Sequence, residues 1–163
     1  MSIRHGGQQL TASPDRLNLQ IRRLGVEDLD RMYAIEEMAY PFPWSRGIFV
    51  ECLRVGYACF GLQLGTDLVG YAIYNWAAAE AHLLNLCIHP EWQHQGYGDL
   101  LLEYVINHVS RLENNVLFLE VRESNPRAKL LYQRKGFAVV SRRPSYYNAG
   151  EGHEDAIVMC MEL

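Results

Sequence analysis

The sequence predicts an α/β fold, a single domain in which helices flank a mixed central sheet. Two patterns and the size of the chain support this class. Apolar stretches of strand length alternate with amphipathic stretches of helix length. The 163 residues suit one domain, and 49% hydrophobic and 21% charged residues are ordinary for a globular protein. Neither an internal repeat nor an internal domain boundary is visible in the sequence.

The N-terminus differs in composition from the rest of the chain. Residues 1–18 are rich in Gln, Gly, Ser and Arg, and they show no hydrophobic periodicity. This stretch also lacks the apolar segment of a signal peptide. We therefore expect a flexible leader at 1–18, followed by one domain at 19–163.

The first half of that domain mixes strand and helix patterns. Alternating apolar residues predict strands, and apolar residues three and four apart predict helices. In order, the patterns place a strand at 19–23, a helix at 26–39, a helix from Ser45 to about Arg54, and strands at 57–63, 68–76 and 81–88. The prolines at 41 and 43 end the first helix, and Ser45 is suited to cap the second. Gly65-Thr66-Asp67 is typical of a hairpin turn.

The second half contains two further helices. Apolar residues at helical spacing predict a long helix that opens at Gly96 and Gly98 and reaches Leu112. Asn125 suits the cap of the next helix, and Pro126 suits its first turn. The other patterns predict, in order, a strand covered on both faces over 116–121, a helix end at Gly136, a strand over 137–141, a polar loop with tyrosines over 144–153, and a strand over 156–161.

Charge and cysteine spacing exclude several classes of protein. A formal net charge of −4 argues against general affinity for nucleic acid or anionic membranes. The apolar stretch 71–88 contains two Asn, a Glu and a His, so it fits two strands and a turn better than a membrane span. The four cysteines lack Cys-x-x-Cys spacing and nearby His ligands. We expect free thiols, no metal, and a cytoplasmic protein.

The segment Leu86–Asp99 carries the strongest functional signal. A strand ends, the chain turns, and Gly96 and Gly98 open a helix. A helix N-terminus presents unpaired N–H groups and the positive end of the helix dipole, and glycine lets a ligand approach closely. The pattern predicts a phosphate-binding turn, although on its own it also fits a turn that binds nothing. It lacks the Lys-Ser/Thr of a Walker loop and the third glycine of a dinucleotide fingerprint.

The order Gln93-x-x-Gly96-x-Gly98, followed by Glu120, Asn125 and Tyr132, resembles the GNAT family of N-acetyltransferases over about residues 19–163. Four further segments are similar to the ribosomal-protein-alanine acetyltransferases of that family. They are Phe42–Ser45, Leu119–Asn125, Leu131–Phe137 and Tyr146–Ile157. The resemblance implies a single-domain GNAT fold, in which helices flank a mixed, mostly antiparallel central sheet and a splayed pair of strands holds acetyl-CoA.

The resemblance also implies roles for individual residues. Strand backbone would hold the pantetheine arm and thioester, the glycine turn would wrap the pyrophosphate, and one asparagine would contact the cofactor. These cofactor-binding residues are Leu86, Cys87, Ile88, His94, Gln95, Gly96, Tyr97, Gly98, Asp99 and Asn125. Glu120 would accept a proton and Tyr132 would donate one, with direct transfer through a ternary complex.

General chemistry supports these two proton carriers. An amine attacks a thioester only when it is neutral, and an α-amino group has a pKa of about 8, so a nearby base helps. Glu120 is the one charge in an apolar strand, although a solvent-facing glutamate is the structural alternative. Tyr132 could protonate the CoA thiolate, whose thiol has an ordinary pKa of about 8.5, unless it is only a core tyrosine. An acyl intermediate on Cys87 is disfavoured because the sequence offers no obvious activating base.

The resemblance implies that the acceptor is the basic N-terminal peptide of small-subunit ribosomal protein eighteen, which begins with alanine. Trp44, Tyr146 and Tyr147 are candidates to line its site. Two alternatives stay open: acetylation of a lysine side chain or small amine, and a CoA-sensing or ribosome-associated module without turnover. We expect a monomer or weak dimer that binds neither nucleic acid nor membrane.

The glycine turn departs from the family pattern. The family places basic residues where this chain has His94 and Gln95, and Asp99 adds a negative charge. Arg127, Lys129 and Arg134 are candidates to compensate by meeting the 3′-phosphate of CoA.

Overall fold

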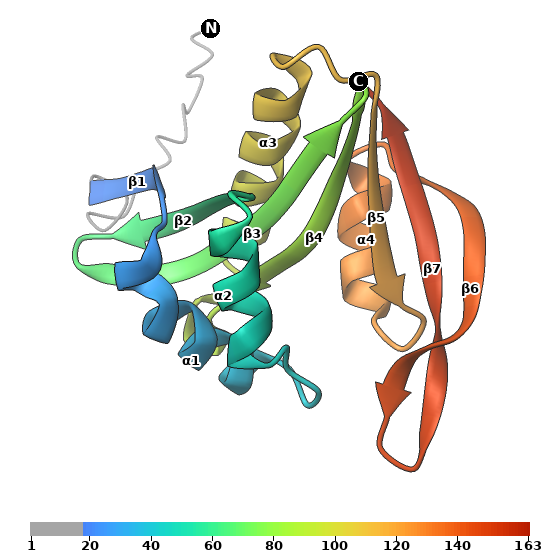
Figure 1. The fold of residues 1–163 in the computed structure, drawn as a ribbon, viewed down its shortest axis with the longest axis horizontal. Helices are drawn as coiled ribbons and strands as arrows, with labels where there is room; N and C mark the ends of the chain where they lie inside the picture. Colours follow the sequence, from blue (N-terminus) through green and yellow to red (C-terminus); the bar gives the residue numbers. More distant parts are fainter. Residues whose placement is uncertain (1–17) are drawn as a thin grey trace, which may run out of the picture.

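Within residues 18–163, the part of the chain that the computed structural model describes, seven strands form one sheet (Figure 1). Their order is β1-β2-β3-β4-β5-β7-β6. The strands are β1 Leu19–Arg23, β2 Ala58–Leu64, β3 Asp67–Ala77, β4 Glu80–Ile88, β5 Val116–Arg122, β6 Ala138–Ala149 and β7 Gly152–Glu162. The pair β4–β5 is parallel and the other neighbours are antiparallel. The predicted α/β class with a mixed, mostly antiparallel sheet is therefore confirmed.

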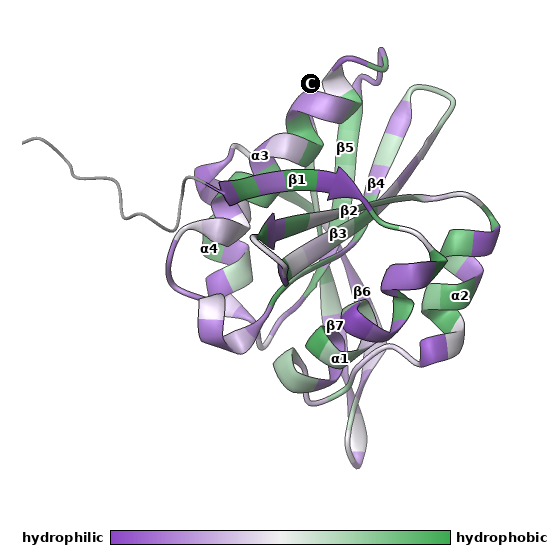
Figure 2. Cartoon of the chain, turned by 90° about the vertical axis from the view of Figure 1, so that its left-hand side faces the viewer, coloured by the Kyte–Doolittle hydropathy of each residue, from purple (hydrophilic) through white to green (hydrophobic). Residues whose placement is uncertain are grey.

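Helices cover both faces of this sheet (Figure 1). They are α1 Leu29–Ala39, α2 Arg46–Arg54, α3 Tyr97–Ser110 and α4 Pro126–Arg134. One hydrophobic layer lies under α1 and α2 and includes Leu29, Met32, Ile35, Phe49, Tyr71 and Ile73. The other lies under α3 and α4 and includes Leu101, Leu102, Val105, Leu117, Leu119 and Tyr132. Figure 2 shows β5 as a mostly hydrophobic strand, whereas hydrophobic and hydrophilic residues alternate along β1.

Local signals account for the helix ends, with small differences. The predicted helix at 26–39 begins with a 3-10 turn, Val26–Asp28, before α1. Ser45 occupies the cap position of α2, but its side chain makes no capping hydrogen bond, so that part of the prediction is wrong. Residues 1–17 lie outside the described residues, so the flexible leader at 1–18 stays a prediction. No helix in residues 18–163 has the length and apolar composition needed to cross a membrane.

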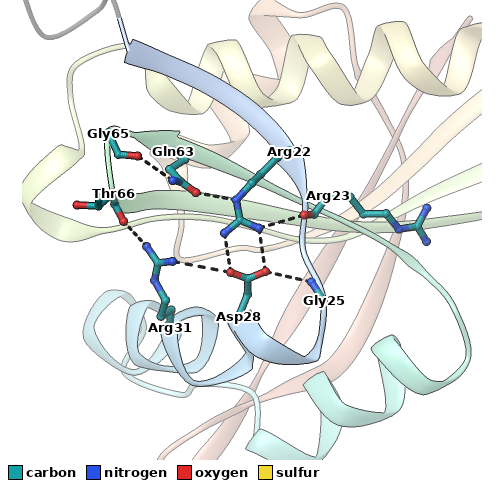
Figure 3. A network of polar contacts seen from close by, with 8 residues as sticks. All are labelled: Arg22, Arg23, Gly25, Asp28, Arg31, Gln63, Gly65 and Thr66. Atoms are coloured by element: carbon teal, nitrogen blue, oxygen red, sulfur yellow. Dashed lines mark hydrogen bonds and ion pairs between the residues drawn. The ribbon is translucent and has the colours of Figure 1, made fainter.

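A buried carboxylate ties the first strand to the first helix (Figure 3). Asp28 is 2% exposed and accepts hydrogen bonds of 2.6 and 2.9 Å from the two Nη atoms of Arg22 in β1. It also accepts the backbone N–H of Gly25 at 3.1 Å, and Arg31 lies 3.8 Å away. The hydrogen bonds from Arg22 lower the pKa of the Asp28 carboxyl below its usual value. This network fixes the edge of the sheet against the start of α1.

Strands β4 and β5 are paired at one end only. The parallel ladder runs from Glu80↔Val116 to Leu83↔Leu119, and β4 then continues to Ile88 without β5. Figure 1 shows the two strands diverging beyond the ladder. Helix α3 follows the free end of β4 and helix α4 follows the free end of β5. Both helix N-termini therefore follow the diverging ends of the two strands.

Two predictions in the C-terminal half are wrong. The polar loop expected over 144–153 is instead a long hairpin, in which Tyr147 pairs with Glu154 and Ala149 pairs with Gly152. Here β6 is almost wholly exposed, so it lacks the apolar alternation that reveals a strand. The strand at 116–121 is not covered equally on both faces. Leu117, Leu119 and Val121 are buried, but the residues between them are only half-buried.

Candidate active site

The free end of β4 presents backbone groups to the space beside it. His89 N–H donates to the carbonyl of Val69 at 2.8 Å, which marks a hydrogen-bonded pair with β3. Such pairs alternate along an antiparallel ladder, so Cys87 also bonds to β3. Leu86 and Ile88 therefore direct their N–H and C=O groups away from β3. In the described residues, β5 supplies no ladder partner to either of them.

Side chains satisfy the carbonyls of these two residues. The Tyr40 hydroxyl donates to Leu86 O at 2.9 Å, and Gln93 Nε2 donates to Ile88 O at 3.0 Å. Gln93 thus ties the glycine turn to the end of β4. The N–H groups of Leu86 and Ile88 remain directed toward the gap, where they can serve an oxygen atom of a ligand.

A cavity of about 190 Å³ lies between the diverging strands. Its walls come from α1, the loop of residues 40–45 (below, the proline loop), β4, β5, α4 and β6. The lining brings together six of the predicted site residues, namely Glu120, Tyr132, Leu86, Asn125, Trp44 and Tyr147. The other predicted site residues lie outside its lining: Cys87, Ile88, His94, Gln95, Gly96, Tyr97, Gly98, Asp99 and Tyr146.

Glu120 lies on the half-buried face of β5 and lines the cavity. Its side chain is 24% exposed, and its Oε1 lies 2.8 Å from Nε of Arg143 on β6. The guanidinium compensates the charge of the carboxylate. The exposed part of the side chain leaves the carboxylate accessible to a ligand in the cavity.

Tyr132 enters the same cavity from α4. Its ring is 8% exposed and packs edge-on against Phe137, with centroids 5.7 Å apart. Burial, with a smaller effect from Cys87, raises the pKa of the Tyr132 hydroxyl to about 12. The hydroxyl is therefore protonated at neutral pH and is suited to donate a proton rather than to accept one.

The Cys87 side chain, which the sequence disfavours as a nucleophile, belongs to the hydrophobic layer under α1 and α2. Its side chain is 2% exposed, and burial followed by the Glu36 charge raises the pKa of the thiol well above its usual value. A buried, protonated thiol is a poor nucleophile. The environment fits a packing role.

The glycine turn ends in the N-terminus of α3. Gly96 caps the helix in the left-handed region, with φ of 84° that glycine adopts without strain. The first helical hydrogen bond is Leu100 N–H to Gly96 O at 3.1 Å. The N–H groups of Tyr97, Gly98 and Asp99 precede that bond, so they lack helical acceptors and are available to an anion.

Basic residues compensate the charge of Asp99, the acid at the start of α3 that departs from the family pattern. Arg134 lies 3.2 Å and Lys135 lies 3.7 Å from the Asp99 carboxylate. Arg127 Nη1 lies 2.8 Å from His94 Nε2, which brings the start of α4 to the glycine turn. The negative charge at Asp99 is therefore offset within the chain.

Asn125 caps α4. Its Oδ1 accepts the N–H of Ala128 at 3.1 Å, as the Asn-Pro pattern predicts. The capping bond occupies the side-chain oxygen, so its NH₂ is the group that can donate to a cofactor.

Aromatic and basic side chains gather where the proline loop meets the β6–β7 hairpin. The Arg122 guanidinium lies 5.4 Å from the ring centre of Phe42 and 4.4 Å from that of Tyr147. Tyr147 in turn packs edge-on against Tyr146 at 4.9 Å. Arg122 also pairs with Glu154 at 2.8 Å, so it joins the proline loop to the β6–β7 hairpin.

Sequence reasoning missed several residues that line or support the cavity, namely Glu36, Tyr40, Phe42, Asn85, Arg122 and Arg143. A signal existed for Glu36, because it lies four residues after Met32 and seven after Leu29, on the apolar stripe of α1. In residues 18–163, no cluster of three or more His, Cys, Asp or Glu is placed to hold a metal ion.

A family model described as the acetyltransferase (GNAT) family matches residues 29–137. The chain belongs to the GNAT acetyltransferase family. The match spans the cavity walls from α1 to α4, and it confirms the predicted fold and acyltransferase class.

Named relatives of this GNAT chain are similar over most of its length. It is 36% identical to the [ribosomal protein bS18]-alanine N-acetyltransferase of Escherichia coli K12, over 88% of this chain and 97% of that protein. The crystal structure of the ribosomal-protein-S18-alanine N-acetyltransferase from Escherichia coli matches with a TM-score of 0.83, covering 88% and 93% of the two chains at 36% identity. These findings confirm the predicted subfamily resemblance.

A more distant match shares the fold. The structure of Arabidopsis thaliana NAA60 in complex with acetyl-CoA has a TM-score of 0.77 and 17% identity, over 89% of this chain and 98% of that one.

Proposed function

We propose that this chain transfers the acetyl group of acetyl-CoA to the N-terminal alanine of a ribosomal protein, the bS18 protein named for its relatives. One observation carries the proposal: a carboxylate, Glu120, and a protonated phenol, Tyr132, line one cavity where β4 leaves β5. The identity of 36% across 97% of the Escherichia coli enzyme supports the same acceptor.

Acetyl-CoA fits the groups that surround the gap. The free N–H groups of Leu86 and Ile88 suit the amides and thioester of an extended arm, and the Asn125 NH₂ is a further donor. The first turn of α3 suits a pyrophosphate because its N–H groups and helix dipole favour negative charge. Acetyl-CoA supplies the activated acetyl group.

The acceptor nitrogen loses two protons in the transfer. Glu120 takes the first proton from the acceptor ammonium, directly or through one water, and the neutral amine then bonds to the acetyl carbonyl carbon. The carbon–sulfur bond breaks, and Tyr132 gives a proton to the departing sulfur. The second proton leaves the nitrogen as the amide forms and returns through water to the Tyr132 oxygen. Strand N–H groups of β4 stabilise the charge that develops on the carbonyl oxygen, at about 2.7–4 kcal/mol per donor in comparable sites.

The acceptor peptide is proposed to enter the cavity between the proline loop and the β6–β7 hairpin (below, the acceptor end of the cavity). Trp44 and Tyr147 line the cavity there, and Tyr146 packs against Tyr147. Such rings provide rigid contact area at small entropic cost. Two acids of β7 are paired with arginines: Glu154 with Arg122, and Asp155 with Arg142 at 3.4 Å.

A peptide assay tests the proposal. A peptide that begins Ala-Arg is expected to be acetylated, with one CoA thiol released per acetyl group, while its N-blocked form is inert. Acetylation of the blocked peptide at lysine would indicate that lysine side chains are the acceptors. Acetylation of polyamines in preference to the peptide would indicate that small amines are the acceptors. Thermal stabilisation by acetyl-CoA without thiol release on any acceptor would indicate a binding module. Mass spectrometry of ribosomal protein N-termini, with and without the gene, then identifies the acceptor in cells.

A further inference from the structure

Glu36 is a buried carboxylate in the cavity wall that the proposed proton transfers do not use. It is 2% exposed, and it lies in the C-terminal half of α1. A buried carboxylate loses its hydration, so it persists only where hydrogen bonds replace the water. The groups that donate hydrogen bonds to Glu36 therefore indicate its structural role.

Three donors from three separate segments meet on this side chain. The backbone N–H of Trp44, in the proline loop, donates to Oε1 at 2.9 Å. The Tyr71 hydroxyl of β3 donates to Oε2 at 2.5 Å, and Asn85 Nδ2 of β4 donates to the same oxygen at 3.1 Å. The carboxylate thus links the proline loop to β3 and to β4, the second of which borders the gap.

Packing holds the same loop at both of its ends. The Tyr40 hydroxyl donates to Leu86 O on the free edge of β4. The Trp44 ring packs edge-on against Phe49 at 5.7 Å, and Phe49 packs edge-on against Tyr71 at 5.6 Å. Phe42, which lies between these two anchors in the sequence, and Trp44 itself line the cavity.

We propose that Glu36 is a positioning residue that holds the proline loop against the free edge of β4 and so sets the shape of the acceptor end. The part of this inference that concerns the acceptor rests on the proposed function. The N–H groups that would hold acetyl-CoA lie on β4, which the ladder with β3 keeps in place, and in the first turn of α3. Loss of Glu36 is therefore expected to impair the acceptor more than the donor.

The position of Glu36 requires a carboxylate because all three of its partners donate hydrogen bonds. Two carboxylate oxygens accept all three hydrogen bonds, whereas glutamine offers one acceptor oxygen and an NH₂ group. In Glu36→Gln, an amide oxygen that keeps the two side-chain donors turns the NH₂ group toward the Trp44 N–H, which then lacks an acceptor. Glu37→Gln is the matched control, because Glu37 is the next residue of α1 and is exposed.

Amide hydrogen exchange tests the anchor without an activity assay. The Trp44 N–H is expected to exchange at least about tenfold faster in Glu36→Gln than in wild type, since a lost hydrogen bond to a charged group is worth that factor or more. Glu37→Gln is expected to leave this rate unchanged. An unchanged Trp44 rate in folded Glu36→Gln would overturn the proposal.

Steady-state kinetics test the acceptor role. In Glu36→Gln, the KM for an Ala-Arg peptide is expected to rise about tenfold, while the KM for acetyl-CoA stays within about twofold. An equal rise in both values, or a rise in neither, would overturn that role. If wild type acetylates no peptide, the proposed function fails, and the exchange experiment still decides the anchor.

A second variant guards against misfolding of Glu36→Gln. Tyr71→Phe removes one donor and leaves the carboxylate bonded to Trp44 and Asn85. The same split between peptide KM and acetyl-CoA KM is expected at smaller size. A peptide KM equal to that of wild type, in a variant whose Trp44 exchange has increased, would contradict the proposal.

Discussion

Nε of Arg143 lies 2.8 Å from Oε1 of Glu120, although the two residues stand on strands that are not neighbours in the sheet. Strand β7 separates β5 from β6, so the arginine side chain crosses β7 to reach the carboxylate. The pair holds Glu120 at the acceptor end of the cavity, where the proposed chemistry needs a base. Substituting either candidate proton carrier should therefore affect turnover more than cofactor binding.

Glu120→Gln is expected to lower kcat by about 10²–10⁴-fold and to leave acetyl-CoA affinity nearly unchanged. The residual rate should follow the neutral fraction of the acceptor amine, so it should rise with pH through the amine pKa of about 8. Steady-state rates across neutral and alkaline pH measure this, with calorimetry for acetyl-CoA. Glu123→Gln, whose carboxylate pairs with Arg142 outside the cavity, is the control. A wild-type pH profile would refute the base assignment.

Tyr132→Phe is expected to slow turnover by about 10²-fold with little change in melting temperature, because the ring still packs against Phe137. With a pKa of about 12, the hydroxyl stays protonated through neutral and mildly alkaline pH. This group alone should therefore cause no loss of wild-type activity below pH of about 10. Tyr104→Phe, on α3 beside Phe60, is the control. Full activity in Tyr132→Phe would remove the acid role.

Asp28→Asn is expected to destabilise the fold by about 2–3 kcal/mol at neutral pH, because it leaves Arg22 without its buried partner. The folded pKa of Asp28 is lowered, so its stabilisation is complete above the unfolded pKa of about 3.9. The stabilisation is lost as the pH falls through the folded pKa.

Urea unfolding at neutral and acidic pH measures the Asp28 effect, and the gap between wild type and variant should narrow in acid. Asp30→Asn is the control, because its side chain is 84% exposed although Arg46 lies 2.8 Å away. Its change should stay below about 0.5 kcal/mol. A gap that widens in acid would contradict the sign of the prediction.

Arg127→Ala is expected to weaken acetyl-CoA binding about fivefold to tenfold at low salt, and less at high salt, if this side chain meets the 3′-phosphate. Calorimetry with acetyl-CoA and with a form that lacks the 3′-phosphate separates this contact from a general charge effect. Arg54→Ala, a distant arginine paired with Glu51, is the control. An equal loss for both ligands would place Arg127 at another phosphate.

Local signals in the sequence predicted the helix starts well. Gly96 must adopt a positive φ, and Asn125 supplies a capping oxygen, so each residue marks its position without help from the rest of the fold. The outer part of the β6–β7 hairpin, residues 144–153, was missed because these residues are almost all exposed, so they lack the apolar alternation that reveals a strand.

The candidate site was predictable from motifs but not from spacing. Glu120 and Tyr132 came from the family resemblance, and the structure places both on one cavity. Arg143 lies 23 residues after Glu120 and meets it across β7, so no local pattern relates the two. The donors to Glu36 come from three segments, which only the assembled fold brings together.

The four residue pairs that join β4 to β5 also make a seam across the described sheet. Strands β1–β4 lie on one side of it and strands β5–β7 lie on the other. This ladder has fewer residue pairs than any other ladder of the described sheet, so we expect it to separate first when the two sides are drawn apart. A substrate that spans the gap would contact both sides of the seam. The sheet would therefore resist separation most strongly while the molecule holds the group that it is about to transfer.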